Sequence, residues 1–202
     1  SINKDLEELS TKLSKKEKTF RLNLCLCRKC GMVQLSDVVP AKLMFKNYLY
    51  IPSASKTRIE HFNELATTLK DKLNLNENDL AVDIGSNDGS LLEVYARLEV
   101  KILGIDPSVN LAKIAELKGI TTVNDYFTQK TARNVVKKYG KAKAITATNV
   151  FAHIDDIHGF VKGIEILLAD DGAFVIEFPY LLDFIENCEF DTIYHEHLSY
   201  FG

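Results

Sequence analysis

The spacing of apolar residues divides most of the chain into one amphipathic helix followed by alternating strands and helices. Ser55 is a suitable N-cap, and the apolar residues after it recur at steps of three and four, which predicts a helix over 55–74. Short β-branched and apolar runs then predict strands at 80–85, 101–106, 120–123, 144–150 and 173–179. The patterns between them predict helices near 89–98, 108–118, 129–139 and 155–169.

Strands that alternate with helices in this way are typical of βαβ units, which build a parallel sheet with helices on both faces. The predicted fold is therefore α/β and Rossmann-like. Sheets of this kind bind ligands in the crevice at the carboxyl ends of their strands. Functional side chains are expected at those ends.

The segment 21–52 follows a different pattern. "FRLNLCLC" alternates apolar and polar residues, "CRKCG" forms a Cys-x-x-Cys-Gly turn, and Pro40 and Pro52 interrupt the remainder. This pattern predicts a small β-rich unit ahead of the main domain. The boundary is placed at residue 54, which divides the chain into 1–54 and 55–202.

Charge and composition exclude several classes of partner. The 202 residues carry a formal net charge of −3, and no run of lysine or arginine is long, so a nucleic-acid partner is not expected. No apolar run approaches the roughly 18 residues of a membrane-spanning helix, and no signal peptide precedes the first folded element. We expect a cytoplasmic protein without a membrane partner.

The turn after the first predicted strand, "VDIGSNDGS", has the features of a cofactor loop. Gly85, Asn87 and Gly89 lie in this turn, and Asp83 lies in the strand just before it. Glycine permits the close backbone approach that a bound ligand requires. A dinucleotide fingerprint would need glycine where this chain has Asn87 and Ser90, which argues against NAD. The turn instead resembles the S-adenosylmethionine (SAM) loop of class I methyltransferases.

The second predicted strand ends in "GIDPS", which places Asp106 about 20 residues beyond the glycine turn. A carboxylate at this position accepts two hydrogen bonds from a ribose diol in NAD or SAM enzymes. A helix N-cap ahead of Pro107 and Ser108 is the alternative role. Together with the loop, Asp106 favours a bound adenosine cofactor.

The ends of the third and fourth strands supply further candidates. Asn124 and Asp125 are predicted to reach an adenine edge, with Phe127 on its face, although such residues also form ordinary turns. After the fourth strand, Asn149 is predicted to face the methyl-donor cavity together with Phe151 and His153. The alternative for His153 is a capped helix start beside Asp155 and Asp156.

The cysteines of "CRKCG" suggest a metal. Cys27 and Cys30 have the spacing of one half of a tetrahedral zinc site, and a redox pair is the alternative. A second pair of ligands is missing, because Cys25 is expected to point away and His61 is poorly placed on its helix. Cys188 is predicted to be a core residue.

In this order, "CRKCGMVQL", "VDIGSNDGSLLE", "GIDPS", "TATNVFAHIDD", "VIEFPYL" and "DTIYHEHLSYF" resemble the sugar-nucleotide C-methyltransferases. Members have a zinc-binding domain with two Cys-x-x-Cys pairs, a SAM domain and a further C-terminal domain. The resemblance implies SAM and structural zinc as cofactors, with 1–54 as a partial zinc-binding unit and 55–202 as a truncated SAM-binding methyltransferase domain. We therefore interpret the chain as a fragment, whose exposed sheet edge could allow self-association.

The stretch "YHEH" is the most specific element of the resemblance. The family's reaction methylates the carbon beside the ketone of a nucleotide-linked 4-keto-deoxysugar, so a base must first remove a proton from that carbon. The resemblance implies His197 as the base, with Tyr194 and Glu196 supporting enolate formation; His195 has no implied role. A zinc site at the two histidines and a structural strand end are the alternatives.

Two tyrosines and two other functions remain to be weighed. Tyr48 and Tyr50 are expected either to line the sugar side of the site or to pack against the helix at 55–74. The alternative functions are a SAM-dependent O- or N-methyltransferase of another small molecule and a non-catalytic SAM-binding fragment.

Overall fold

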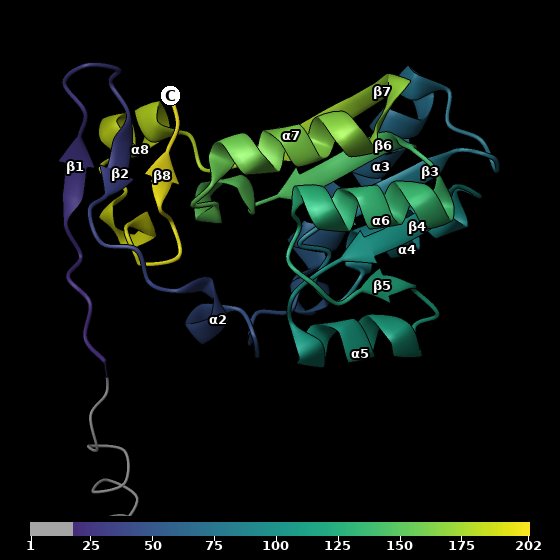
Figure 1. Cartoon of the computed structure of the whole chain (residues 1–202), viewed down its shortest axis with the longest axis horizontal. Helices are drawn as coiled ribbons and strands as arrows, with labels where there is room; N and C mark the ends of the chain where they lie inside the picture. Colours follow the sequence, from purple (N-terminus) through teal and green to yellow (C-terminus); the bar gives the residue numbers. More distant parts are fainter. Residues whose placement is uncertain (1–17) are drawn as a thin grey trace, which may run out of the picture.

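In the computed structural model, residues 18–202 are described, so the first part of the predicted 1–54 unit lies outside the described residues. The central element is a parallel sheet in the strand order β5-β4-β3-β6-β7 (Figure 1). Its strands are β3 (Leu80–Ile84), β4 (Lys101–Ile105), β5 (Thr122–Val123), β6 (Ala142–Thr148) and β7 (Leu168–Glu177). The predicted α/β, Rossmann-like fold is confirmed.

Helices cover both faces of this sheet. The core on one face is formed with α6 (Gln129–Tyr139) and α7 (Ile157–Leu167). The core on the other face is formed with α3 (Lys56–Leu73), α4 (Ser90–Arg97) and α5 (Val109–Leu117). The β3 strand is buried along its whole length because it lies at the centre of the sheet. This burial explains why every residue of the strand except Asp83 is apolar.

Element boundaries agree with the sequence pattern except near β7. Ser55 caps α3 as predicted, because its side chain accepts a hydrogen bond from the backbone N–H of Arg58 at 3.3 Å. The predicted strand at 173–179 instead begins at Leu168, directly after α7. The extension pairs Leu168 with Ala142 across a register irregularity in β6, a contact that apolar periodicity does not reveal.

A second, smaller sheet joins the two ends of the described chain. It has the order β1-β2-β8, all antiparallel, with β1 (Leu24–Leu26), β2 (Val33–Leu35) and β8 (Ser199–Tyr200). Figure 1 shows this sheet beside the main body, with α8 (Leu181–Asn187) packed next to it. The sheet thus contains strands from both sides of the boundary at residue 54, which stays a prediction.

Short helical segments connect these elements. They are α2 (Ala41–Met44) and the 3-10 helices η1 (Pro52–Ala54), η2 (Phe151–His153) and η3 (Phe190–Thr192). The prediction for Cys188 was wrong: this residue ends α8 at φ 56° and is exposed. No residue of α8 is buried, so the helix lies on the surface and so does Cys188, which follows its last residue. Within residues 18–202, no helix is both long and apolar enough to cross a membrane.

Candidate active site

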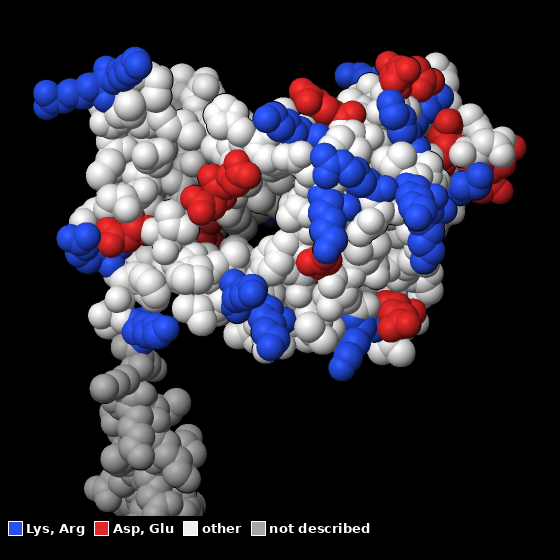
Figure 2. All heavy atoms as spheres, viewed as in Figure 1, with Lys and Arg blue, Asp and Glu red and all other residues white. Residues whose placement is uncertain are grey.

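A cavity of about 460 Å³ lies at the carboxyl ends of the central strands. Its walls come from the loops after β3, β4 and β6, from the segment 45–52, and from the turn that contains "YHEH". Figure 2 shows the molecule hollowed between the small sheet and the main body. A cavity of this volume is within the range of small-molecule and cofactor sites.

The glycine loop forms one wall of the cavity. Gly85 has φ 69°, and a Cβ atom added to it would lie 2.3 Å from Cγ2 of Val150. Asn87 also has a positive φ of 52°, and both residues line the cavity. Gly89 has φ 79° but does not line the cavity; its missing Cβ makes room for Ile120. Only the first half of the loop can therefore touch a bound ligand.

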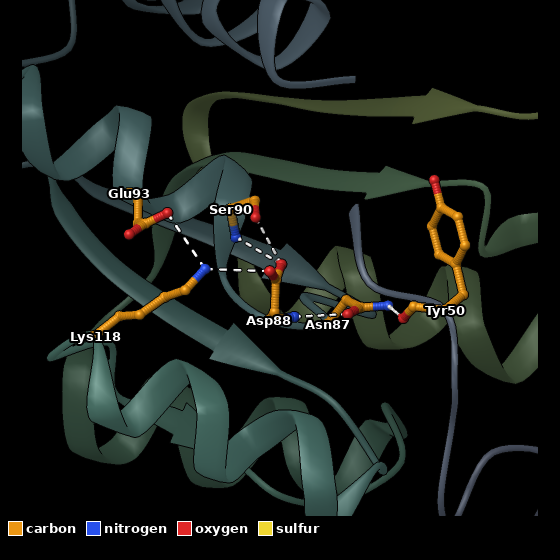
Figure 3. Close-up of polar contacts among 6 residues, drawn as sticks. All are labelled: Tyr50, Asn87, Asp88, Ser90, Glu93 and Lys118. Atoms are coloured by element: carbon orange, nitrogen blue, oxygen red, sulfur yellow. Dashed lines mark hydrogen bonds and ion pairs between the residues drawn. The ribbon is translucent and has the colours of Figure 1, made fainter. Parts of the chain in front are cut away.

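A polar network behind the loop holds it in place (Figure 3). Asp88 is fully buried and accepts hydrogen bonds from the backbone N–H and the hydroxyl of Ser90. Its other oxygen pairs with Lys118 Nζ at 3.1 Å. Burial alone would raise the pKa of Asp88, but hydrogen bonds from Ser53, Ser90 and Lys118 lower it below its usual value. The side-chain amide of Asn87 donates to the Tyr50 carbonyl, which ties the loop to the segment 45–52.

Two buried carboxyl groups face the cavity. Asp106 accepts hydrogen bonds from the backbone N–H groups of Asn87 at 2.8 Å and Ser108 at 2.7 Å, one on each oxygen. A second lone pair remains on each oxygen for a ligand hydroxyl. Asp83 accepts a hydrogen bond from the Thr146 hydroxyl at 2.6 Å. Burial raises the pKa of Asp106, and burial raises the pKa of Asp83 to about 7.

The residues after β5 divide between the cavity and the surface. The side chain of Asn124 donates to the carbonyl oxygen of Asp106, and Asp125 accepts from the backbone N–H of Tyr126. Neither predicted residue lines the cavity, whereas Tyr126 and Phe127 do. The rings after β5 are therefore placed to contact a ligand, while the polar pair shapes the turn that holds them.

The loop after β6 contacts a carboxylate that sequence reasoning missed. Asn149 lines the cavity at φ 55°, and its side chain donates to Glu177 Oε1 at 3.2 Å. The same oxygen pairs with Nη1 of Arg58 at 2.9 Å, and the other pairs with His61. Arg58 lines the cavity. The acid in "VIEFP", at the carboxyl end of a strand, was the available sequence signal for this cluster.

The hydrogen bonds of His197 define its tautomer. Its Nδ1 lies 2.9 Å from the carbonyl oxygen of Thr192, and a carbonyl can only accept, so Nδ1 carries the hydrogen. In the neutral ring, Nε2 then carries the lone pair, and the Tyr194 hydroxyl donates a hydrogen bond to it at 2.8 Å. Burial lowers the pKa of His197 below its ordinary value. The geometry is that of a neutral imidazole able to accept a proton at Nε2.

A second histidine stacks on the first. The His153 and His197 ring centroids are 5.2 Å apart, and Phe45 also stacks on His153, with a centroid distance of 5.4 Å. Burial, with a smaller contribution from His197, lowers the pKa of His153 to about 4. Its Nε2 is buried with no hydrogen-bond partner among the described residues. His153 lines the cavity, and Asp156 caps the start of α7 that follows it, so the structure contains both features that the sequence suggested for this segment.

The remaining two residues of "YHEH" point elsewhere. Glu196 accepts a hydrogen bond from the Tyr48 hydroxyl at 2.8 Å; Tyr48 lines the cavity and Glu196 does not. Burial and the neighbouring Glu196 raise the pKa of Tyr48. His195 lies outside the cavity and contacts the carbonyl of Phe20 at 3.2 Å. The two histidines therefore have different surroundings, and residues 18–202 contain no cluster of three or more potential metal ligands.

The cysteine pair fits one half of a metal site. The backbone N–H of Gly31 donates to the carbonyl of Cys27, which closes the turn between Cys27 and Cys30. Hydrogen bonds from the backbone of Cys30 and Lys29 lower the pKa of Cys27. A lower pKa favours the thiolate, the form that binds zinc. Cys25 and Cys30 are exposed.

The donor set of the cavity suits a cationic nucleoside such as SAM. The buried carboxyl groups of Asp83 and Asp106 can bind positive charge and ribose hydroxyls, the turn at Gly85 admits close backbone approach, and Tyr126 and Phe127 offer aromatic faces. The wall is otherwise largely apolar. Nothing in this arrangement requires a pyrophosphate, which the glycine pattern also argues against.

Comparisons with known proteins agree with this geometry. Residues 58–202 match the family profile "Methyltransferase domain", and residues 7–45 match "Putative zinc binding domain". The chain is 36% identical over 186 residues to "C-methyltransferase NovU" of Streptomyces niveus. That alignment covers 92% of this chain and 44% of NovU, so the chain spans less than half the length of this relative.

Solved structures show the same fold. An S-adenosylmethionine-dependent methyltransferase from Clostridium acetobutylicum ATCC 824 matches with a TM-score of 0.52 at 16% identity, covering 64% of this chain and 54% of that chain. A SAM-dependent methyltransferase from Archaeoglobus fulgidus matches with a TM-score of 0.54 at 16% identity, covering 68% and 61%. With a profile match that covers residues 58–202, the chain belongs to the SAM-dependent methyltransferase family.

Proposed function

We propose that this protein is a SAM-dependent C-methyltransferase that acts on the carbon beside the ketone of a nucleotide-linked 4-keto-deoxysugar. The observation that carries the proposal is the tautomer of His197, whose Nε2 lone pair lies in the same cavity as the glycine loop. The name of NovU as a C-methyltransferase supports methylation at carbon. The sugar-nucleotide substrate rests on the resemblance of "YHEH" and the neighbouring motifs.

Within this proposal, His197 is the general base. Its Nε2 accepts the proton from the carbon beside the carbonyl, and the electron pair of the broken C–H bond forms the enolate. The Thr192 carbonyl, which accepts from Nδ1, orients the ring and stabilises the positive charge that protonation creates. Because the pKa of His197 is lowered, the ring stays neutral and competent over a wider pH range on the acid side.

The neighbours of His197 have supporting roles. The Tyr194 hydroxyl, 2.8 Å from Nε2, can donate to the developing enolate oxygen once substrate displaces this hydrogen bond. Glu196 holds Tyr48 at the cavity wall, and the unpaired Nε2 of His153 can bind a polar group of the acceptor. When bound, SAM supplies an electrophilic methyl group on its sulfonium. Asp83, Gly85, Asn87, Asp106 and Asn149 line the side on which it is expected to bind.

A deuterium-exchange experiment tests the base. The protein is incubated in D₂O with a 4-keto-deoxysugar nucleotide and SAM carrying a ¹³C-labelled methyl group, and NMR follows both deuterium at the sugar carbon and the new methyl signal. We expect exchange and a methyl group bonded to carbon. His197→Asn should reduce both by about a hundredfold to ten-thousandfold, the range that general-base catalysis contributes.

His195→Asn is the matched control, because His195 lies next to the same turn but outside the cavity. It should leave exchange and methylation close to wild type. A methyl group on oxygen or nitrogen would instead support the O- or N-methyltransferase. Exchange that persists in His197→Asn would remove His197 as the base.

We also propose Cys27 and Cys30 as two thiolate ligands of a structural zinc ion. Their spacing and the lowered pKa of Cys27 support this role. Zinc content measured after dialysis should fall when both are changed to serine and should be unchanged in Cys188→Ser.

A further inference from the structure

Arg58 is the only lysine or arginine among the described residues that line the cavity. It lies in the first turn of α3, and its guanidinium pairs with Glu177 through Nη1 at 2.9 Å. A guanidinium has five N–H donors, so most of them are free after this contact. The cavity therefore contains one fixed cation with spare donors among carboxyl groups and apolar walls.

The strand order places Arg58 on a defined side of the glycine loop. The loop follows β3, which lies between β4 and β6 in the sheet. Asp106 follows β4 on one side, whereas Asn149 follows β6 on the other and is bonded to Glu177, the partner of Arg58. A nucleoside whose ribose lies at Asp106 would extend its 5′ substituent across Gly85 toward Arg58.

The charges along the path from Asp106 across Gly85 to Arg58 match those of the amino-acid end of the cofactor. Asp83 and Asp106 are acidic groups, and Arg58 is the positive group beyond them. SAM carries an ammonium, a sulfonium and one carboxylate at the end of its chain. A carboxylate needs a cation or several N–H donors in a half-buried site, and arginine supplies both in planar geometry.

We infer that Arg58 binds the α-carboxylate of the methionine part of SAM. Glu177 holds the guanidinium in place, because it also accepts from Asn149 and from His61 and so connects α3 to the loop after β6. The contact adds an anchor at the methionine end of the cofactor. It does not depend on which acceptor is methylated.

Two ligands that differ in the carboxylate alone test the inference. Calorimetry measures the dissociation constants of S-adenosylhomocysteine and of its decarboxylated analogue, S-adenosyl-3-thiopropylamine. We expect the wild-type protein to prefer the carboxylated ligand by about ten- to hundredfold, the range for a hydrogen bond to a charged group. Arg58→Met should reduce this preference to less than about threefold by weakening S-adenosylhomocysteine alone.

Two further variants keep the test decisive. Arg58→Lys retains the charge without the planar fork and should keep part of the preference, which covers the case in which Arg58→Met does not fold. Arg97→Met is the matched control. Arg97 hydrogen-bonds Asn63, which lies in α3 like Arg58, but Arg97 does not line the cavity. It should keep the full preference.

The outcomes separate this inference from the proposed reaction. Equal weakening of both ligands in Arg58→Met, or no weakening of either, would overturn the role of Arg58 in binding the carboxylate. No acceptor is present in this experiment, so a wrong acceptor would leave its result unchanged.

Discussion

Lys118, at the end of α5, reaches the fully buried carboxylate of Asp88 with its Nζ atom at 3.1 Å. Asp88 also accepts from the backbone and side chain of Ser90, at the start of α4. The pair therefore connects the end of α5 to the glycine loop at the start of α4, on one face of the sheet (Figure 3). A charge buried so completely depends on its partners for stability.

Lys118→Met should destabilise the protein by about 1–3 kcal/mol, because it leaves Asp88 buried with only neutral donors. Urea unfolding measures the change. Lys141→Met is the control, since the partner of Lys141 is the exposed Asp170, and little change is expected. Equal effects of the two substitutions would show that burial of Asp88 does not govern the stability of the loop.

Gly85→Ala should destabilise the protein more than Gly119→Ala. Both glycines have positive φ, 69° and 78°, but a Cβ at Gly85 would meet Val150 at 2.3 Å, whereas Gly119 has nothing within 4 Å. We expect about 1 kcal/mol for Gly119→Ala from backbone strain and about 2–4 kcal/mol for Gly85→Ala. Adding Val150→Ala to Gly85→Ala should recover part of the loss in unfolding experiments. No recovery would show that the side-chain clash is unimportant.

Binding of SAM near pH 6 should release a proton from Asp83. Burial raises the pKa of this carboxyl to about 7, so in the free protein the carboxyl is largely protonated at pH 6. A bound cation favours the ionised form and lowers the pKa. Calorimetry in buffers of different ionisation enthalpy measures the release, which should vanish in Asp83→Asn and decline above pH 8. Release that persists in Asp83→Asn would assign the proton to another group.

His153 should make the protein less stable in acid. Its pKa falls from 6.5 to about 4 on folding, so between these values the unfolded chain binds more protons than the folded one. The part of the unfolding free energy that depends on a neutral His153 is fully present above pH 6.5. It is lost as the pH falls toward 4, and the loss is about 3 kcal/mol at most. His153→Phe should flatten the decline of unfolding free energy over this range. An unchanged slope would contradict a buried neutral His153.

Several site residues could be predicted from the sequence because their positions follow from local pattern. Apolar runs located the strands, and the residues directly after a strand in a parallel sheet must meet at one edge. Asp83, Gly85, Asn87, Asp106 and Asn149 all line the cavity for this reason. Asn124 and Asp125 occupy equivalent places in the sequence, but their side chains bond to neighbouring backbone instead.

Other features depend on contacts that no local pattern reveals. Arg58 and Glu177 are 119 residues apart in the chain, and each alone looks like an ordinary charge on a helix or at a strand end. Strand β8 has two residues, too few for periodicity to predict it, and it exists because it pairs with β2 near the other end of the described chain. Cys188 looked like a core residue by type, although its short helix lies on the surface.

The sequence by itself determined the parallel sheet, its helices and the glycine loop, because apolar periodicity and the backbone freedom of glycine act over a few neighbouring residues. Only the tertiary structure decided that Nε2 of His197 is the nitrogen without a hydrogen and that Arg58 faces the cavity. A tautomer is set by the acceptor that folding brings to Nδ1, and a charged side chain gains its role from partners on distant strands.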